Sequence, residues 1–144
     1  MLMPKRTKYR KVQRGRMKGL SRARKVVFGT YGLMAVEPGW LNARQIESAR
    51  VTMSRRLKKG GELFLRVFPD KPITKKPAET RMGKGKGSPE FWACVVKRGK
   101  ILFEVADVAE KDARMILEAA SYKIPMKTRF VCKDDGDVLS KQVN

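Results

Sequence analysis

The chain of 144 residues contains no histidine and only two cysteines. Histidine is the commonest general base in enzymes and, together with cysteine, the commonest zinc ligand. Cys94 and Cys132 lie far apart in the sequence, each in an apolar run, so they cannot form a zinc site. We therefore expect two buried free thiols, no metal and no cofactor, and no enzyme built on histidine or a Cys–His pair.

Acidic residues are absent before Glu37, whereas the first 25 residues hold eleven Lys and Arg. These are Lys5, Arg6, Lys8, Arg10, Lys11, Arg14, Arg16, Lys18, Arg22, Arg24 and Lys25. Repulsion between these charges opposes collapse in water, whereas phosphates offer each cation a partner and release counterions on binding. We expect residues 1–25 to form an extended arm that binds nucleic acid and is disordered in the free protein.

Long hydrophobic runs are also missing. The longest mostly apolar stretch, 26–36, is interrupted by Gly29, Thr30 and Gly32 and is far shorter than the ~20 residues of a membrane helix. The start of the chain reaches charged residues without the apolar region of a secretory signal. We expect an intracellular protein without a membrane span, with an organelle transit peptide as the alternative interpretation of the Arg-rich start.

The net charge of +20 is unevenly distributed. Residues 1–100 carry +21, whereas residues 101–144 carry −1. The hydrophobic content of 42% suffices for one small core, which must lie outside the basic stretches. We predict one domain over residues 26–133, with a polar tail over residues 134–144.

The remaining chain alternates between strand-like and helix-like patterns. Strands are expected over 26–36, over 62–68 and over 126–132, and a hairpin is expected from 91–96 and 100–105 around Arg98-Gly99.

Two helices are expected between these strands. Asn42 should cap the first, with Gln45 completing a capping box, and Asp107 should cap the second, with Glu110 three residues on. Each helix has an apolar stripe. The stripes are Ala43, Ile46, Ala49, Met53 and Leu57 in the first, and Ala109, Ala113, Ile116, Leu117 and Ala120 in the second. The fold class is α+β, with two helices packed on a mostly antiparallel sheet.

Cations recur on the polar side of the first predicted helix and in the segment between Pro69 and Pro89. The helix contributes Arg44, Arg50, Arg55, Arg56, Lys58 and Lys59 as further candidate RNA-binding residues. The segment combines six Lys and Arg with five Pro and Gly and contains almost nothing that could pack. We expect residues 75–89 to project from the domain as a long, basic, Gly-rich loop. Its glycines lack the spacing of a nucleotide-binding loop, so a small-molecule substrate is not expected.

Several motifs resemble one known family. They are Met3-Pro4-Lys5-Arg6-Thr7-Lys8-Tyr9-Arg10-Lys11, Arg14-Gly15-Arg16-Met17-Lys18-Gly19, Phe28-Gly29, Gly32-Leu33, Glu37-Pro38-Gly39-Trp40-Leu41, Ile46-Glu47-Ser48-Ala49-Arg50, Phe68-Pro69-Asp70-Lys71-Pro72, Lys76-Pro77-Ala78-Glu79-Thr80-Arg81-Met82-Gly83-Lys84-Gly85-Lys86-Gly87 and the strand around Trp92. The chain is similar over residues 1–133 to large-subunit ribosomal protein sixteen in its bacterial form.

This resemblance implies a structural, non-catalytic component of the large ribosomal subunit that joins late in assembly. Its implied partners are large-subunit rRNA, tRNA at the aminoacyl site and neighbouring ribosomal proteins, and its implied location is the ribosome of the bacterial cytoplasm, with a plastid or mitochondrial ribosome less favoured. The tRNA-proximal loop would comprise Lys75, Lys76, Arg81, Met82, Gly83, Lys84 and Lys86.

Two other functions stay open on the residues alone. A free-standing protein that compacts nucleic acid would also be small, basic and poor in histidine, but it would bind duplex DNA. An RNA-processing enzyme with two carboxylates and a metal ion would turn RNA over, although no acids cluster near the basic segments. An extended arm and a Gly/Lys loop suit irregular RNA surfaces better than a regular groove.

Overall fold

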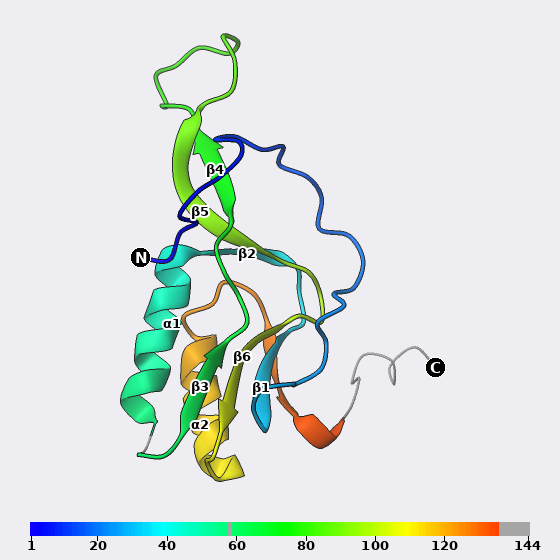
Figure 1. The fold of residues 1–144 in the computed structure, drawn as a ribbon. Helices are drawn as coiled ribbons and strands as arrows, with labels where there is room; N and C mark the ends of the chain where they lie inside the picture. The colour runs from blue at the N-terminus through cyan, green and yellow to red at the C-terminus, as the bar shows by residue number, and fades with distance from the viewer. Residues whose placement is uncertain (58, 136–144) are drawn as a thin grey trace.

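A computed structural model of the chain describes residues 1–57 and 59–135, which form an α+β fold of two α-helices and seven β-strands (Figure 1). The elements are β1 (Tyr31–Ala35), β2 (Gly39–Asn42), α1 (Ala43–Arg56), β3 (Glu62–Leu65), β4 (Lys71–Lys75), β5 (Ser88–Val96), β6 (Ile101–Ala106), α2 (Glu110–Ser121), β7 (Thr128–Cys132) and a final 3-10 turn, η1 (Lys133–Asp135). The predicted fold class is confirmed.

The strands form two sheets. One has the order β3-β6-β1-β7 and the other the order β2-β5-β4, and every pair of neighbours is antiparallel. The predicted arrangement contained only one sheet, because short-range patterns show where strands lie but not which strands pair.

Helix α1 begins as its sequence predicts. The Asn42 side chain accepts a hydrogen bond from the Gln45 backbone N–H at 2.8 Å, and the Gln45 side chain accepts one from the Asn42 N–H at 3.0 Å. This reciprocal pair satisfies two donors at the helix start. Ala43, Ile46 and Met53 of the predicted stripe are buried.

Helix α2 begins differently from the prediction. Asp107 does not cap it, because the backbone of Asp107 adopts a positive φ of 59° and turns the chain out of β6 before the helix. The N-cap is Ala109, which makes no side-chain hydrogen bond. Ala113, Ile116, Leu117 and Ala120 of the predicted stripe are buried, which confirms that part of the prediction. Ala109 is exposed.

The predicted hairpin between β5 and β6 is wrong. Both strands exist, but they belong to different sheets. The turn at 97–100 forms as expected, with the Lys100 N–H donating to the Lys97 carbonyl at 3.2 Å, while Gly99 N–H donates to the Ala35 carbonyl at 2.7 Å. The bond from Gly99 to the end of β1 shows that the turn carries the chain from one sheet to the other.

A second correction concerns the segment between Pro69 and Pro89, which contains strand β4 as well as a loop. The β-branched Ile73 and Thr74 pair with residues of β5. Pro72 is buried in β4. Because β4 lies at the edge of its sheet, the N–H that Pro72 lacks is not needed there. The predicted loop 75–89 therefore narrows to residues 76–87 at the tip of the β4–β5 hairpin, which projects from one end of the molecule (Figure 1).

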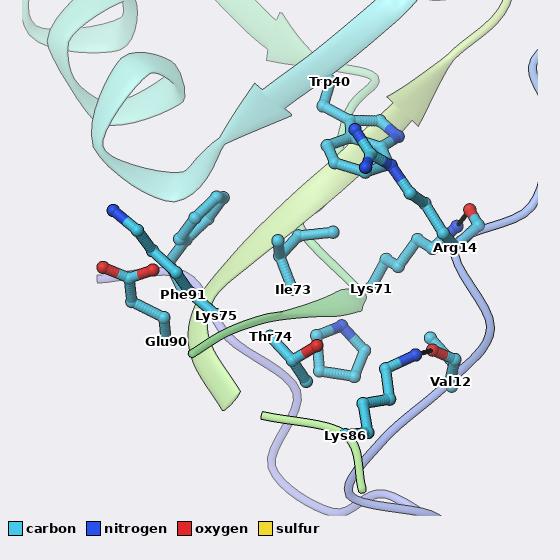
Figure 2. A pocket seen from close by; sticks show the side chains of 11 residues that line it. Val12, Arg14, Trp40, Lys71, Ile73, Thr74, Lys75, Lys86, Glu90 and Phe91 are labelled. Atoms are coloured by element: carbon cyan, nitrogen blue, oxygen red, sulfur yellow. Dashed lines mark hydrogen bonds between the residues drawn. The ribbon is translucent and has the colours of Figure 1, made fainter. Parts of the chain in front are cut away.

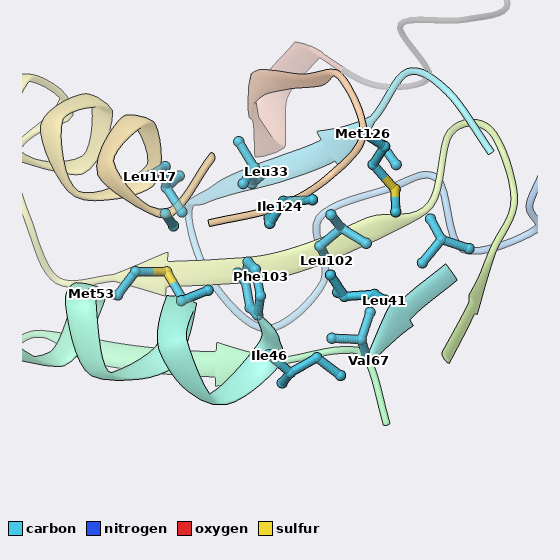
Figure 3. Close-up of a cluster of buried hydrophobic side chains, with 14 of the residues drawn as sticks. Leu33, Leu41, Ile46, Met53, Val67, Leu102, Phe103, Leu117, Ile124 and Met126 are labelled. Carbon is cyan, nitrogen blue, oxygen red and sulfur yellow. The ribbon is translucent and has the colours of Figure 1, made fainter. Parts of the chain in front are cut away.

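The main core lies between the helices and the sheets (Figure 3). Phe103, Met53 and Leu117 are fully buried there. Strand residues alternate between sheet faces, so Met34 points away from the helices and joins a small second cluster with Val26, Ile101 and Val131. The second cluster places the root of the basic arm against the sheet face opposite the helices.

Candidate nucleic-acid interface

The root of the arm is fixed to β6 by one buried carboxylate. Glu104 is fully buried and accepts hydrogen bonds from three consecutive backbone N–H groups: Val27 at 3.1 Å, Phe28 at 2.6 Å and Gly29 at 2.7 Å. The Arg66 guanidinium adds a fourth donor at 2.7 Å. A buried carboxylate is tolerated only when its oxygens are paired in this way, so Glu104 holds residues 27–29 in one place.

Glycine is required at the last of these three positions. A Cβ on Gly29 would lie 2.7 Å from the Val105 carbonyl oxygen, closer than real side chains approach. The Arg66 guanidinium also donates to the Lys25 carbonyl at 2.5 Å and lies 5.8 Å from the Phe28 ring centroid. The ion pair of Glu104 and Arg66 therefore holds the arm root on both sides of Val26, at residues 27–29 and at Lys25.

Residues 1–30 contain no helix or strand, but their backbone touches the body at further points. Leu20 forms an isolated bridge with Arg98, and the Ser21 N–H donates to the Arg98 carbonyl at 2.9 Å. The Ile101 N–H donates to the Ala23 carbonyl at 2.9 Å. The arm then continues along the β2-β5-β4 sheet toward the projecting hairpin (Figure 1).

Trp40 lies where the arm crosses this sheet. The Arg14 guanidinium carbon is 4.9 Å from the indole centroid, and the Lys71 ammonium is 5.6 Å from it. Lys71 also donates to the Arg14 carbonyl oxygen. A cavity of about 210 Å³ lies between the arm and the sheet at this point (Figure 2).

The projecting loop is exposed over most of its length, with the Met82 side chain 100% exposed. Gly83, Lys84 and Gly85 all have positive φ values, of 95°, 60° and 89°. Glycine adopts this conformation without strain, so the Gly-Lys-Gly sequence allows the backbone to turn back sharply. The Lys76 ammonium closes the turn by donating to the Gly83 carbonyl at 2.7 Å.

The arm and the loop are joined to each other. The Lys86 ammonium donates to the Val12 carbonyl at 2.5 Å, and the Lys11 ammonium donates to the Lys86 carbonyl at 3.0 Å. Because the acceptors are neutral carbonyl oxygens, both ammonium charges remain uncompensated by these bonds. The structure thus brings two basic segments 75 residues apart in sequence into one cationic surface.

The predicted RNA-binding cations lie on the arm and on or just beyond α1. In the arm all are exposed except Arg24, which is half-buried. On α1, Arg44, Arg55 and Arg56 are exposed, as is Lys59 beyond it, but they follow the helix away from the loop (Figure 1). Lys58 lies outside the described residues.

Arg50 differs from the other helix cations. Its guanidinium donates to the Glu47 carboxylate at 3.0 and 2.5 Å. This hydrogen bond, together with the charge of Arg50, lowers the pKa of Glu47, so the pair stays ionised at neutral pH. Arg50 therefore already has an anionic partner, and Arg44 and Arg55 are the freer contributors to an interface.

Glu104, Arg66 and Trp40 were not predicted from the sequence. A signal for Glu104 was present, since it is the single charge within the apolar run Ile101–Ala106, and a charge in a buried strand needs a partner. The contacts of Arg66 and Trp40 depend on how the arm crosses the sheets. Short-range sequence patterns do not show how the arm crosses the sheets.

The described residues contain no group of three or more His, Cys, Asp or Glu side chains that could hold a metal ion. Cys94 and Cys132 are free thiols, the first buried and the second half-buried, and burial raises the pKa of Cys132 so that it stays protonated. No helix among the described residues is long and apolar enough to span a bilayer.

A small α+β core with a cationic arm and a projecting cationic loop is typical of basic, RNA-binding structural proteins. A comparison with protein families identifies the particular one: the family model described as Ribosomal protein L16p/L10e matches residues 4–131. The chain belongs to this family, whose members are structural, non-enzymatic components of the large ribosomal subunit. The family found from the sequence motifs is thereby confirmed.

Proposed function

We propose that the chain is a structural component of the large ribosomal subunit that binds rRNA through its arm, supports late subunit assembly, and contacts tRNA near the aminoacyl site through its loop. The observation that carries this proposal is the junction of arm and loop, where Lys86 binds the Val12 carbonyl and Lys11 binds the Lys86 carbonyl. The junction presents two sets of exposed cations as one surface, and the family supplies the ribosomal setting.

The shape of this surface favours RNA over duplex DNA. The arm has no helix that could enter a major groove, and the loop is a narrow projection with positive-φ glycines. Folded RNA presents phosphates and unstacked bases from several directions. An extended arm and a separate projection can reach such groups at the same time.

Within the loop, Arg81 is the residue that we assign to tRNA contact. Its side chain is exposed near the exposed Met82. The planar guanidinium can bridge two phosphate oxygens or stack on a base, whereas an ammonium acts as a point charge. Lys84 and Lys86 would add charge on either side of Gly85.

The exposed cations of α1 extend the same proposal. Arg44, Arg55 and Arg56 would contact rRNA beside the main surface, because they have no anionic partner in the hydrogen bonds and ion pairs of the described residues. We place the protein in the ribosome of a bacterial cytoplasm, with organellar ribosomes as the alternative. Neighbouring ribosomal proteins would complete its surroundings.

Binding and assembly can be tested together. The purified chain should bind a large-subunit rRNA transcript in the presence of excess duplex DNA, and it should complete large subunits reconstituted without it. Chemical footprinting should then show that the arm protects rRNA and that a chain lacking residues 1–19 does not. Equal competition by duplex DNA would favour a free-standing compacting protein, and metal-dependent loss of the transcript would favour an RNA-processing enzyme.

A further inference from the structure

The cavity between the arm and the β2-β5-β4 sheet has the features of a site for one RNA base. Its volume of about 210 Å³ exceeds the ~150 Å³ that admits a benzene ring and is smaller than the ~300 Å³ at which pockets for drug-sized ligands begin. A cavity of this size accepts one planar ring system but not a stack of two nucleotides.

The walls suit a flat, unstacked ring. Trp40, Ile73 and Phe91 supply apolar surface, and the strand register places Ile73 directly opposite Phe91 (Figure 2). Bases that leave the RNA stack are commonly held against aromatic side chains. Trp40 has the larger ring system of the two aromatic side chains that line this cavity.

The indole also carries an unsatisfied donor. Trp40 Nε1 is buried and has no hydrogen-bond partner, and it is the only buried side-chain N or O atom of this kind among the described residues. A buried donor without a partner is unfavourable. Because the indole N–H donates in the plane of the ring, an acceptor beside a stacked base, such as a ribose or phosphate oxygen, could satisfy it, whereas the stacked base itself could not.

Arg14 occupies the indole face in the free protein. Its guanidinium lies 4.9 Å from the ring centroid, in the position that a stacked base would take. Arg14 is exposed and belongs to a segment without helix or strand, so it can leave the indole when a phosphate offers it a stronger, charge-assisted bond.

Cations line the cavity beside its aromatic walls. Lys71 and Lys86 each donate to an arm carbonyl oxygen, of Arg14 and Val12 respectively. These neutral oxygens occupy the places that phosphate oxygens would take with stronger bonds. Glu90 is the only acid that lines the cavity.

We propose that this cavity binds one unstacked base of rRNA, with Trp40 as the stacking wall and with Arg14, Lys71 and Lys86 on the adjoining phosphates. This inference rests on the proposed function and adds where a base is held. Binding moves Arg14 from the indole to RNA, which couples docking of the arm to filling of the cavity.

Tryptophan fluorescence provides the test, because the chain has only two tryptophans. In the full-length Trp92→Phe variant, emission comes from Trp40 alone. A single-stranded A6 RNA should quench this emission and should bind roughly 5- to 150-fold more tightly than an abasic hexamer of the same charge, the range given by stacking one base. Adenosine monophosphate is the probe for a free-nucleotide site.

Substitutions at Trp40 isolate the contribution of the base. Trp40→Ala should bring the affinity ratio between A6 and the abasic hexamer close to one without changing the affinity for the abasic hexamer. Trp40→Phe keeps an aromatic wall and should retain part of the ratio, and Trp92→Phe should retain all of it. Because the fluorescence readout needs no change at Trp40, it decides the matter even if Trp40→Ala fails to fold.

Each remaining result has a distinct meaning. Equal affinity for the two hexamers, or binding of A6 without quenching of Trp40, overturns the base site and leaves rRNA binding intact. Adenosine monophosphate that binds as tightly as A6 also overturns it, in favour of a free-nucleotide site. Failure of both hexamers and of the rRNA transcript to bind would instead overturn the proposed function.

Discussion

Glu104 shows how a single residue sets the position of the arm. Burial of a carboxylate is costly unless its oxygens are paired, and here three backbone N–H groups and Arg66 pair them. The three backbone bonds also fix residues 27–29 at the sheet. One side chain thus links the stability of β6 to the direction in which the basic segment leaves the body.

We predict that Glu104→Gln destabilises the protein by about 3 kcal/mol, within the range for breaking a buried ion pair. The amide keeps one acceptor but turns an NH₂ group toward donors, and it leaves Arg66 without its anion. Urea denaturation followed by circular dichroism measures the change. Glu62→Gln, at an exposed position on β3, is the matched control and should stay within ~0.5 kcal/mol. Equal stability of the two variants would show that the Glu104 contacts contribute little.

At the scale of elements, the two helix starts form a natural comparison. Helix α1 has a complete capping box at Asn42, whereas α2 begins at Ala109 without a side-chain bond. Both N-cap residues have extended backbone, with ψ of 163° and 150°, so both positions can hold a capping side chain.

We therefore expect opposite effects on stability from removing the cap of α1 and from adding a cap to α2. Asn42→Ala should lower the free energy of unfolding by about 1 kcal/mol, and Ala109→Ser should raise it by a similar amount, since a Ser hydroxyl can accept from the first turn of α2. Thermal and urea unfolding of both variants measure this. A neutral Ala109→Ser variant would mean that the N–H groups of the first α2 turn are already satisfied by water.

The elements also show how far the sequence could be used for prediction. The α1 cap and the apolar stripes were predicted correctly because they depend on residues three or four apart. The β5–β6 hairpin and the Asp107 cap were predicted wrongly, because they depended on which sheet accepts β6 and on the turn that follows it. Strand β4 was not predicted because its Lys and Pro residues obscured Ile73 and Thr74. The candidate cations were found from charge alone, whereas their arrangement around Trp40 required the fold.

The loop 76–87 can be altered without touching the core. We predict that the combined change Arg81→Ala, Lys84→Ala and Lys86→Ala leaves stability within ~0.5 kcal/mol, as is typical of exposed substitutions. The same change should weaken accommodation of aminoacyl-tRNA on reconstituted subunits, measured by stopped-flow kinetics at full occupancy of the protein.

A matched control keeps this prediction specific to the loop. Lys111→Ala with Lys123→Ala removes exposed charge near α2 and should leave tRNA kinetics unchanged. Unaltered kinetics in the loop variant would assign the loop to rRNA anchoring alone.

At the scale of the whole molecule, the packed core and most of the arm's cations lie in different parts of the chain. The body supplies the core, and the arm supplies cations with few apolar groups. In the structure the arm touches the body at residues 20–29, through Arg98, Ile101 and Glu104. It also touches the body at Val12 and Arg14 and at Leu2, which packs against the main core. The disorder expected over residues 1–25 of the free protein stays a prediction, and these contacts suggest where it should end.

We predict a gradient of mobility along the arm of the free protein. Heteronuclear relaxation should give rigid values at residues 26–29, where Glu104 binds the backbone, and low order parameters over residues 5–11, which are exposed and carry five cations. Addition of an rRNA fragment should raise the low values. An arm as rigid as β1 in the absence of RNA would contradict the predicted disorder.

The salt dependence of binding tests the charge of the arm most directly. If the arm and the exposed cations of α1 neutralise about 6 to 10 phosphates, the affinity for an rRNA fragment should fall ~10³- to 10⁵-fold between 50 and 200 mM salt. Removing residues 1–19 deletes eight cations but keeps the Glu104 anchor. Each phosphate that the truncated chain no longer neutralises should flatten the slope of log affinity against log salt by about 0.9 on duplex RNA segments and less on single strands.

The control for this experiment separates charge from fold. Glu104→Gln retains every cation, so its salt slope should match that of the parent chain even if its stability is lower. Filter binding across a salt series measures both slopes. A truncated chain with the parent's slope would place the phosphate contacts on α1 and on the loop, where the other candidate RNA-binding cations lie. A flattened slope together with retained stability would show that the arm binds RNA while the body folds without it.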